Sequence, residues 1–400
     1  MQLDDLEAAP LLVPLTPLEA YRRDARQPTL DESASEPLSS WLAVAVMLRR
    51  YADSEASERP VLHAELQLLL RRANAGETQD EDLGAAVRNL ALVAEDAGAQ
   101  HLAFSILALN ESVHATDTLE RGRSLAQRAR IARKAGNLEI ATNLYREVEL
   151  LGKQSKLREL LSRAYLGYGL LAFHRGGYPD ARQWFARAVT IADDIGVADV
   201  SSMAHHGLMI AAGVAGELEE ALVEGWTAFK CAAGDKDREG EMLSSLGQIL
   251  LEGGQAQSSL FAFAAALQRT ALARITLPAW GGLAVAASQI DDVALVERAA
   301  SEIARLTKRH NLPYPAVSAH FDLAVAYERV GRRALAEKHR RQALSSAKHH
   351  GFHEFVYRAE SLGDTMAAAV VASRPFTSAG LDVLAELRHL GGLEALASRS

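Results

Sequence analysis

The chain has very little cysteine and no long apolar run. Its 400 residues include a single cysteine, Cys231, so no disulfide can form within the chain and no cysteine-based structural zinc site can be built. One cysteine is what a reducing compartment permits, and we expect a cytoplasmic protein. Residues 1–7 are acidic, unlike a secretory signal, and the longest early apolar run, residues 41–48, is far shorter than the ~20 residues of a membrane span. We expect no membrane anchor.

Aromatic residues are also scarce. They make up 6% of the chain, whereas hydrophobic residues as a whole make up 48% and charged residues 24%. The core must therefore consist mostly of alanine and leucine, which favour helices. The 51 acidic side chains outnumber the 43 basic ones, and the net charge of −8 argues against a surface adapted throughout to nucleic acid. The densest basic run, residues 121–134, contains no aromatic residue, so nucleic acid is not an expected partner.

The sequence lacks the common catalytic motifs. No GxxxxGK[ST], GxSxG, HExxH or GxGxxG occurs in a fitting context. Cys231 and His206 could be imagined as nucleophile and base, but a catalytic thiol needs an oriented base and an oxyanion site that nothing specifies. The metal-like cluster of His349, His350 and His353 lacks an obvious complete ligand set. We therefore expect a non-enzyme with no catalytic residue, no metal site and no cofactor.

The two ends of the chain differ from its middle. Six of the eleven prolines fall within the first sixty residues, and residues 1–34 are predicted to form an irregular arm because each proline removes a backbone donor and fixes φ. Residues 35–79 are predicted to form a helical hairpin, which could be a degenerate first repeat. Beyond Gly351 the helical periodicity of the apolar residues weakens. We expect residues 351–400 to be capping helices or a dimer contact.

The middle of the chain repeats at intervals of 37 to 40 residues. The residues that mark the repeat are Gly98, Gly136, Gly176, Gly216, Gly254, Asp291 in the equivalent place, and Gly331. Five residues further lie Ala103, Ala141, Ala181, Ala221, Ser259, Val296 and Ala336. We predict pairs of helices that meet at a turn where glycine takes a positive φ, with small residues allowing close approach. Because one hairpin cannot bury its own apolar face, stacked hairpins are predicted, in seven repeats over residues 80–350.

Residues 165–188 give the clearest copy of the repeat. Its aromatic residues are followed by Gly169, Gly176, Ala181, Phe185 and Ala188, an arrangement that resembles the tetratricopeptide repeat (TPR). A second copy contains Leu246, Gly247, Gly254, Phe263 and Ala266. The intervals exceed the usual ~34 residues of the family, and the proline between repeats is missing, as in the longer TPR-like arrays of bacterial regulators and kinesin-light-chain-like proteins. The resemblance implies an all-α fold, a right-handed solenoid of helical hairpins.

The resemblance also implies a binding groove. In TPR proteins the first helix of each repeat lines a concave surface along which peptides lie. The residues that match by register are Arg88, Asn89, Arg123, Gln127, Arg130, Arg163, Leu166, Leu170, Phe173, His206 and Ile210. The arginines could pair with carboxylates of a partner, and the apolar residues could take its leucine or phenylalanine side chains. The alternative is that Leu166, Leu170 and Ile210 belong to the core.

These observations favour a cytoplasmic TPR scaffold or adaptor that binds a peptide or protein segment in its groove. An alternative is the ligand- or peptide-sensing part of a bacterial transcription regulator. An enzyme with an unrecognised site is a third hypothesis, which no residue pattern supports. Homo-oligomers could form through the N-terminal arm, which is apolar between Leu11 and Leu18, or through the C-terminal helix.

Overall fold

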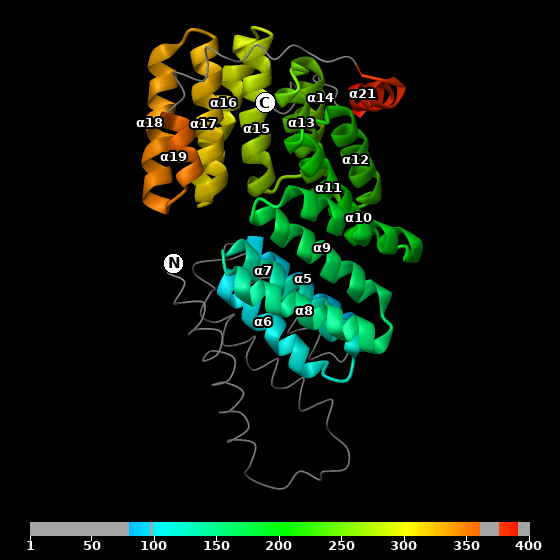
Figure 1. The fold of residues 1–400 in the computed structure, drawn as a ribbon. Helices are drawn as coiled ribbons and strands as arrows, with labels where there is room; N and C mark the ends of the chain where they lie inside the picture. Colours follow the sequence, from blue (N-terminus) through cyan, green and yellow to red (C-terminus); the bar gives the residue numbers. More distant parts are fainter. Residues whose placement is uncertain (1–79, 97–98, 361–375, 391–400) are drawn as a thin grey trace. The chain divides into compact units, whose positions relative to one another are not determined.

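The computed structural model of the chain describes residues 80–96, 99–360 and 376–390. Within these ranges every regular element is a helix, and the helices pack mainly against their neighbours along the chain (Figure 1). The predicted all-α helical solenoid is thereby confirmed. The arm at 1–34, the hairpin at 35–79 and Gly98 lie outside the described residues, as do 361–375 and 391–400 in the predicted C-terminal region.

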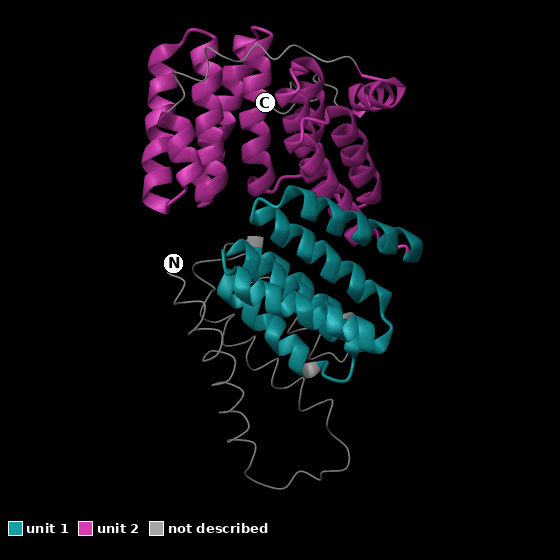
Figure 2. Ribbon diagram, viewed as in Figure 1, with its two compact units in different colours: residues 1–195 teal, residues 196–400 magenta. Residues whose placement is uncertain are grey.

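The chain divides into two compact units after Ile195 (Figure 2). The described helices of unit 1 are α5 (Asp80–Asp96), α6 (Gln100–Val113), α7 (Thr118–Lys134), α8 (Leu138–Ser155), α9 (Arg158–His174) and α10 (Tyr178–Ile195). Those of unit 2 are α11 (Ala198–Val214), α12 (Leu218–Cys231), α13 (Lys236–Glu252), α14 (Ala256–Arg269), α15 (Ala273–Gln289), α16 (Val293–Arg309), α17 (Pro313–Arg329), α18 (Arg333–His350), α19 (His353–Glu360) and α21 (Ser378–Leu390). Each unit is built from successive helix pairs joined by short turns.

The turns inside the helix pairs have the predicted left-handed backbone. The glycines with φ between 74° and 84° are Gly136, Gly176, Gly216, Gly254 and Gly331. Asp291, which replaces glycine in this position, has a φ of 60°. Aspartate tolerates this region better than most residues, because its short polar side chain can bond locally. The periodic glycines therefore reflect a backbone requirement of each hairpin.

Substituting a turn glycine tests this requirement. Gly254→Ala is expected to lower the free energy of unfolding by about 1 kcal/mol, because alanine disfavours a positive φ. A Cβ at this position would meet nothing within 4 Å, so the cost comes from the backbone alone. Urea denaturation followed by circular dichroism measures it. Gly254→Asn should cost less, since asparagine tolerates the left-handed region, and equal losses for both variants would contradict this explanation.

Small residues on the second helices lie in the interior as predicted. The residues five positions after each turn are at most 3% exposed, namely Ala103, Ala141, Ala181, Ala221, Ser259, Val296 and Ala336. The polar residue Asn110 on α6 is also buried, with 2% of its surface exposed. Its Nδ2 donates to Glu120 Oε1 and to Ser124 Oγ, both at 2.8 Å. Burial of this amide is thus compensated by hydrogen bonds.

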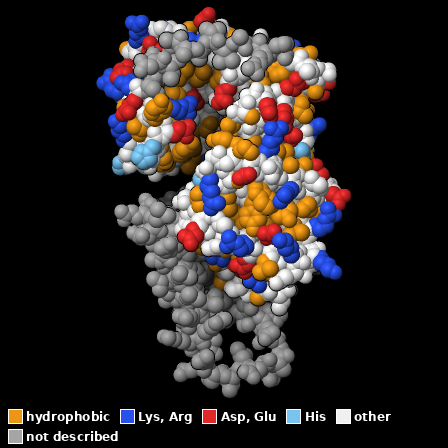
Figure 3. All heavy atoms as spheres, in the orientation of Figure 1, with side chains coloured by type: hydrophobic (Ala, Val, Ile, Leu, Met, Phe, Trp, Pro, Cys, Tyr) orange, Lys and Arg blue, Asp and Glu red, His pale blue; other side chains and the backbone are white. Residues whose placement is uncertain are grey.

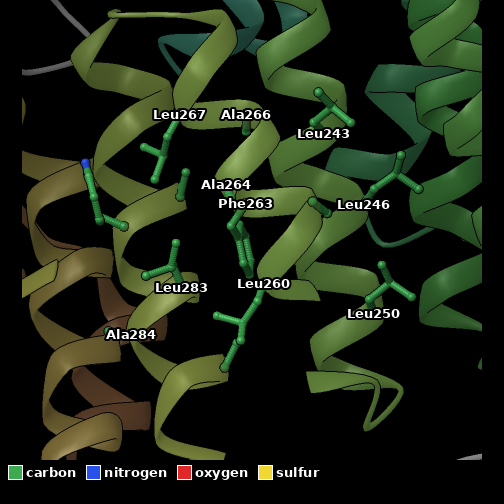
Figure 4. Close-up of a cluster of buried hydrophobic side chains, with 14 of the residues drawn as sticks. Leu243, Leu246, Leu250, Leu260, Phe263, Ala264, Ala266, Leu267, Leu283 and Ala284 are labelled. Carbon is green, nitrogen blue, oxygen red and sulfur yellow. The ribbon is translucent and has the colours of Figure 1, made fainter. Parts of the chain in front are cut away.

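The TPR-like glycines on the first helices make room for aromatic rings. A Cβ at Gly169 would lie 2.5 Å from the ring of Phe185, and one at Gly247 would lie 2.7 Å from the ring of Phe263. Both distances are far below a normal contact, so only glycine permits these approaches. Figure 4 shows Phe263 between Leu246 and Leu283 in the core of unit 2.

The C-terminal helix α21 packs against α12 and α14 within unit 2. Its apolar residues Val383, Leu384 and Leu387 are at most 5% exposed and belong to the core cluster around Phe263. The start of α21 is held by a carboxylate, because the Thr377 and Gly380 backbone N–H groups donate to Glu219 at 3.3 Å. Within the described residues, the apolar side of this helix is therefore covered by its own chain.

Candidate functional site

The candidate groove residues of unit 1 lie on three first helices, α5, α7 and α9. Residues of α7 at 123, 127 and 130 recur every three or four positions and so share one side of the helix, as do those of α9 at 163, 166 and 170. Because α7 packs against both α5 and α9, the rows lie side by side. We call the set the first-helix strip, and it consists of Arg88, Asn89, Arg123, Gln127, Arg130, Arg163, Leu166, Leu170 and Phe173.

One end of the strip is an ion-pair cluster around Glu159. Arg123 donates to both carboxylate oxygens, at 2.7 Å from Nε and 2.8 Å from Nη2, and Arg163 Nε donates to the same carboxylate at 3.0 Å. Burial acts to raise the pKa of Glu159, but the hydrogen bonds and charges of Arg123 and Arg163 hold that pKa below its usual range. Glu159 therefore stays ionised and fixes both arginines.

The other end is a cluster around Glu95, whose side chain is 7% exposed. This carboxylate accepts from Arg130 at 2.5 Å and from Lys134 at 2.6 Å. Between the two clusters, Gln127 Nε2 donates to the backbone oxygen of Arg88 at 3.1 Å, which links α7 to α5. The polar side chains of the strip are thus held in place by partners from neighbouring first helices.

These partners were not foreseen from the sequence, which suggested that the arginines pair with a bound peptide. The structure also pairs Arg88 with Glu120. The signal that could have revealed the pairs is their separation, which is 36 residues for Arg123 with Glu159 and 35 for Arg130 with Glu95. A spacing close to the repeat length brings residues of successive first helices together.

The apolar residues of the strip are neither core nor fully exposed. Leu166, Leu170 and Phe173 are partly buried, and the neighbouring Leu92 on α5 is 38% exposed. Elsewhere on α9, Leu160 and Ala164 are fully buried. Asn89 is exposed at the edge of the strip. Partly exposed leucines beside fixed charged groups form a surface that can bury further apolar area on binding.

The remaining candidates, His206 and Ile210, lie on α11 in unit 2. His206 Nε2 is 3.0 Å from Ser245 Oγ, and burial lowers the pKa of this histidine. Ile210 packs against the core of unit 2. Cys231 has a different neighbour, since its sulfur lies 3.4 Å from Ser201 Oγ. His206 is thus engaged with Ser245.

A second candidate surface in unit 1 is aromatic. The ring of Trp184 on α10 lies 5.4 Å from that of Tyr165 and 5.1 Å from that of Tyr168, and the guanidinium of Arg187 lies 4.7 Å from its centre. Tyr168 Oη donates to Glu149 Oε2 at 2.7 Å. Figure 3 shows hydrophobic side chains gathered on the visible face of unit 1. From the sequence, these aromatic residues were predicted only as part of the repeat motif.

Among the described residues, no group of histidine, cysteine, aspartate and glutamate side chains is arranged to hold a metal ion. His349 and His350 instead pack edge to face, with ring centres 4.7 Å apart. In the same part of the chain, no helix combines the length and the apolar character that crossing a bilayer requires.

The comparisons with known proteins identify the fold. No protein-family model matches the chain, and no curated protein is similar to it in sequence. Among solved structures, it is similar to a Signal Transduction ATPase with Numerous Domains (STAND) protein with a tetratricopeptide repeat sensor from Pyrococcus horikoshii, with a TM-score of 0.52 and 14% identity. The fold is TPR-like. The likeness covers 86% of this chain and 54% of the other, so the chain spans about half the length of that protein.

The TPR-like fold confirms the resemblance read from the Gly169 and Gly247 motifs. At 14% identity the likeness concerns the fold and carries no residue roles. The residues of a TPR-like site must therefore be argued from this chain, through the ion pairs and partly exposed leucines of the first-helix strip.

Proposed function

We propose that the chain is a non-catalytic TPR-like adaptor that binds a peptide or protein segment along the first-helix strip. The observation that carries this proposal is that two partly exposed leucines, Leu166 and Leu170, follow the ion-paired Arg163 on the same side of α9. Side chains fixed before binding lose little conformational entropy when a partner docks. Burial of the leucines at ~25 cal/mol per Å² would then contribute directly to affinity.

The charge of the strip favours an acidic segment with apolar side chains. Five cations, Arg88, Arg123, Arg130, Lys134 and Arg163, pair with three carboxylates, Glu95, Glu120 and Glu159. An arginine has five N–H donors, so a guanidinium held by one glutamate can still bind a second carboxylate. The partner's acidic groups would set its register, and its apolar groups would cover the leucines.

A sensing role is the second candidate. The likeness to a STAND protein whose tetratricopeptide repeats form a sensor supports it. On this hypothesis the chain is the ligand- or peptide-sensing part of a transcription regulator, and its partner carries the DNA-binding or ATPase module. A cytoplasmic location, a bacterial source and homo-oligomers stay predictions from the sequence.

The proposed binding site is tested by replacing an apolar residue of the first-helix strip with a charged one. We expect that the wild-type chain captures a specific protein from its native lysate and that Leu170→Asp loses it, because a carboxylate would be buried against the partner. Binding of a peptide from the captured protein should weaken at least tenfold in calorimetric titration. Leu150→Asp is the matched control, since Leu150 is 53% exposed on α8, outside the strip.

Circular dichroism must show that both variants fold. If Leu170→Asp and the control capture the partner protein equally well, the first-helix strip is not the binding site. A captured protein that contains an ATPase or DNA-binding module would favour the sensing role over a plain adaptor.

A further inference from the structure

Unit 1 has an aromatic surface that the first-helix strip does not include. It consists of Tyr165 and Tyr168 on α9 and Trp184 on α10, whose side chains are all partly buried. Tyr168 contacts both neighbouring helices, because its hydroxyl donates to Glu149 on α8 and its ring lies 5.1 Å from that of Trp184. Glu149 also pairs with Lys153 at 2.7 Å. The aromatic surface therefore lies over α9 between α8 and α10, on a different side of α9 from the strip.

Two hydrogen-bond donors of the aromatic surface are unused. Within the described part of the chain, neither Tyr165 Oη nor Trp184 Nε1 has a hydrogen-bond partner, and neither atom is fully buried. A polyproline II (PPII) helix has no internal hydrogen bonds, so its backbone carbonyls are free to accept from such donors. Aromatic-lined grooves are also the usual binding sites of PPII segments. The surface thus fits a proline-rich ligand.

Arginines flank the rings on both sides. The guanidinium of Arg187 on α10 lies 4.7 Å from the centre of the Trp184 ring. On the α8 side, the charge of Arg146 acts on the Tyr168 hydroxyl. Both arginines are exposed, and neither forms an ion pair with a carboxylate among the described residues. A proline-rich ligand with acidic residues beside it would complement this charge.

The N-terminal arm of the chain contains a segment with this chemistry. Residues 10–18 include three prolines and no charged residue, and they follow the acidic residues Asp4, Asp5 and Glu7. A PPII helix has three residues per turn. In that conformation one edge would consist of Leu11, Pro14 and Pro17, and the next edge of Leu12, Leu15 and Leu18. Two neighbouring edges that are wholly apolar favour burial against a surface.

The link between this segment and the repeats is long enough for docking within one chain. Residues 19–34, which are predicted to be irregular, span up to about 50 Å when extended at ~3.3 Å per residue. The 18 residues of α10 are about 27 Å long. A tethered segment has an effective concentration on the order of millimolar. A weak intrinsic affinity is therefore sufficient to keep it bound.

We propose that the aromatic surface binds residues 10–18 of the chain's own N-terminal arm as a PPII helix. The edge with Pro14 and Pro17 packs on the three rings, and backbone carbonyls accept from Tyr165 and Trp184. The acidic residues that precede the segment face the two arginines. The proposed adaptor function uses the other side of α9, so either proposal can fail without the other.

Paramagnetic broadening in the full chain tests this docking. The chain is labelled with 5-fluorotryptophan, and a nitroxide is attached at Ala20→Cys in a Cys231→Ser background, which is free of other cysteines. The fluorine resonance of Trp184 is assigned with Trp184→Phe. We expect this resonance to be at least twofold broader than after reduction of the nitroxide. Equal line widths before and after reduction would overturn the proposal.

Proline variants show whether the segment itself is responsible. Pro14→Ala with Pro17→Ala should abolish the broadening, because alanine neither fixes φ for PPII nor supplies the ring that packs on the aromatic surface. Pro28→Ala is the control in the same arm, outside the segment, and should retain the broadening. The same broadening in both variants would refute the docking of residues 10–18, without any change to the residues of the repeats.

A mixing experiment separates docking within one chain from exchange between two copies. Fluorinated chain without nitroxide is mixed with an equal amount of nitroxide-labelled chain without fluorine. We expect no broadening of the Trp184 resonance in the mixture. Broadening there would mean that the arm of a second copy occupies the aromatic surface, and docking within one chain would then be wrong.

Discussion

Phe263→Ala is expected to lower the free energy of unfolding of unit 2 by about 3–5 kcal/mol, the range for truncating a buried phenylalanine. Phe263 is 1% exposed. A Cβ built at Gly247 or Gly282 would lie 2.7 or 2.2 Å from its ring, which shows how closely two first helices approach it. The surrounding helices cannot collapse into the space without losing these contacts, so most of the cavity would remain.

Urea denaturation measures this loss, with Phe261→Ala as the matched control. Phe261 lies two residues earlier on α14 and is partly exposed, so its truncation should cost about 1 kcal/mol. Because repeat arrays can unfold in parts, fluorescence and circular dichroism should be compared for coincident transitions. A similar small loss for both variants would mean that the ring of Phe263 is not the packing centre of unit 2.

The ring of Phe263 also shows which parts of the fold the sequence could predict. A glycine on one helix and an aromatic residue on the next must recur together, because a side chain at Gly247 would collide with the ring. The positive φ at Gly254 is likewise a local requirement that few residues satisfy. Because each requirement recurs in every repeat, the same residue types recur in the sequence at regular intervals. The repeat and its turns could be predicted from these intervals.

The candidate site was less predictable, because its properties depend on pairs of side chains from different helices. Arg130 is equally suited to a partner's carboxylate and to Glu95, and only the packing of α7 against α5 decides between them.

Acidification is expected to destabilise unit 2 through a pair of histidines. His320 on α17 is 6% exposed, and its Nδ1 lies 3.2 Å from Nδ1 of His339 on α18. This distance fits a pair of neutral rings in which one Nδ1–H donates to the other. Tyr327 stacks on His339 at 5.6 Å and donates its hydroxyl to Glu297. Two positive charges could not share this arrangement.

Burial lowers the pKa of His320 and of His339 to about 4, and the nearby charge of Lys338 acts in the same direction. The folded state therefore binds fewer protons than the unfolded state between pH 4 and the usual histidine pKa of about 6.5. The stability conferred by the neutral pair is complete above pH 6.5 and is lost as the pH falls towards 4. The loss should be on the order of 3 kcal/mol for each histidine, at about 1.4 kcal/mol per pKa unit.

Urea denaturation at pH 7.5 and pH 4.5 measures this loss, and the double variant His320→Gln with His339→Gln should remove most of it. Asp322 gives a control of opposite sign, because burial raises the pKa of its carboxyl to about 7. Its contribution is lost as the pH rises from about 4 through 7, so Asp322→Asn should stabilise the protein at pH 7.5 and not at pH 4.5. If the histidine variant and the wild type lose stability in parallel on acidification, the acid-sensitive element lies elsewhere in the chain.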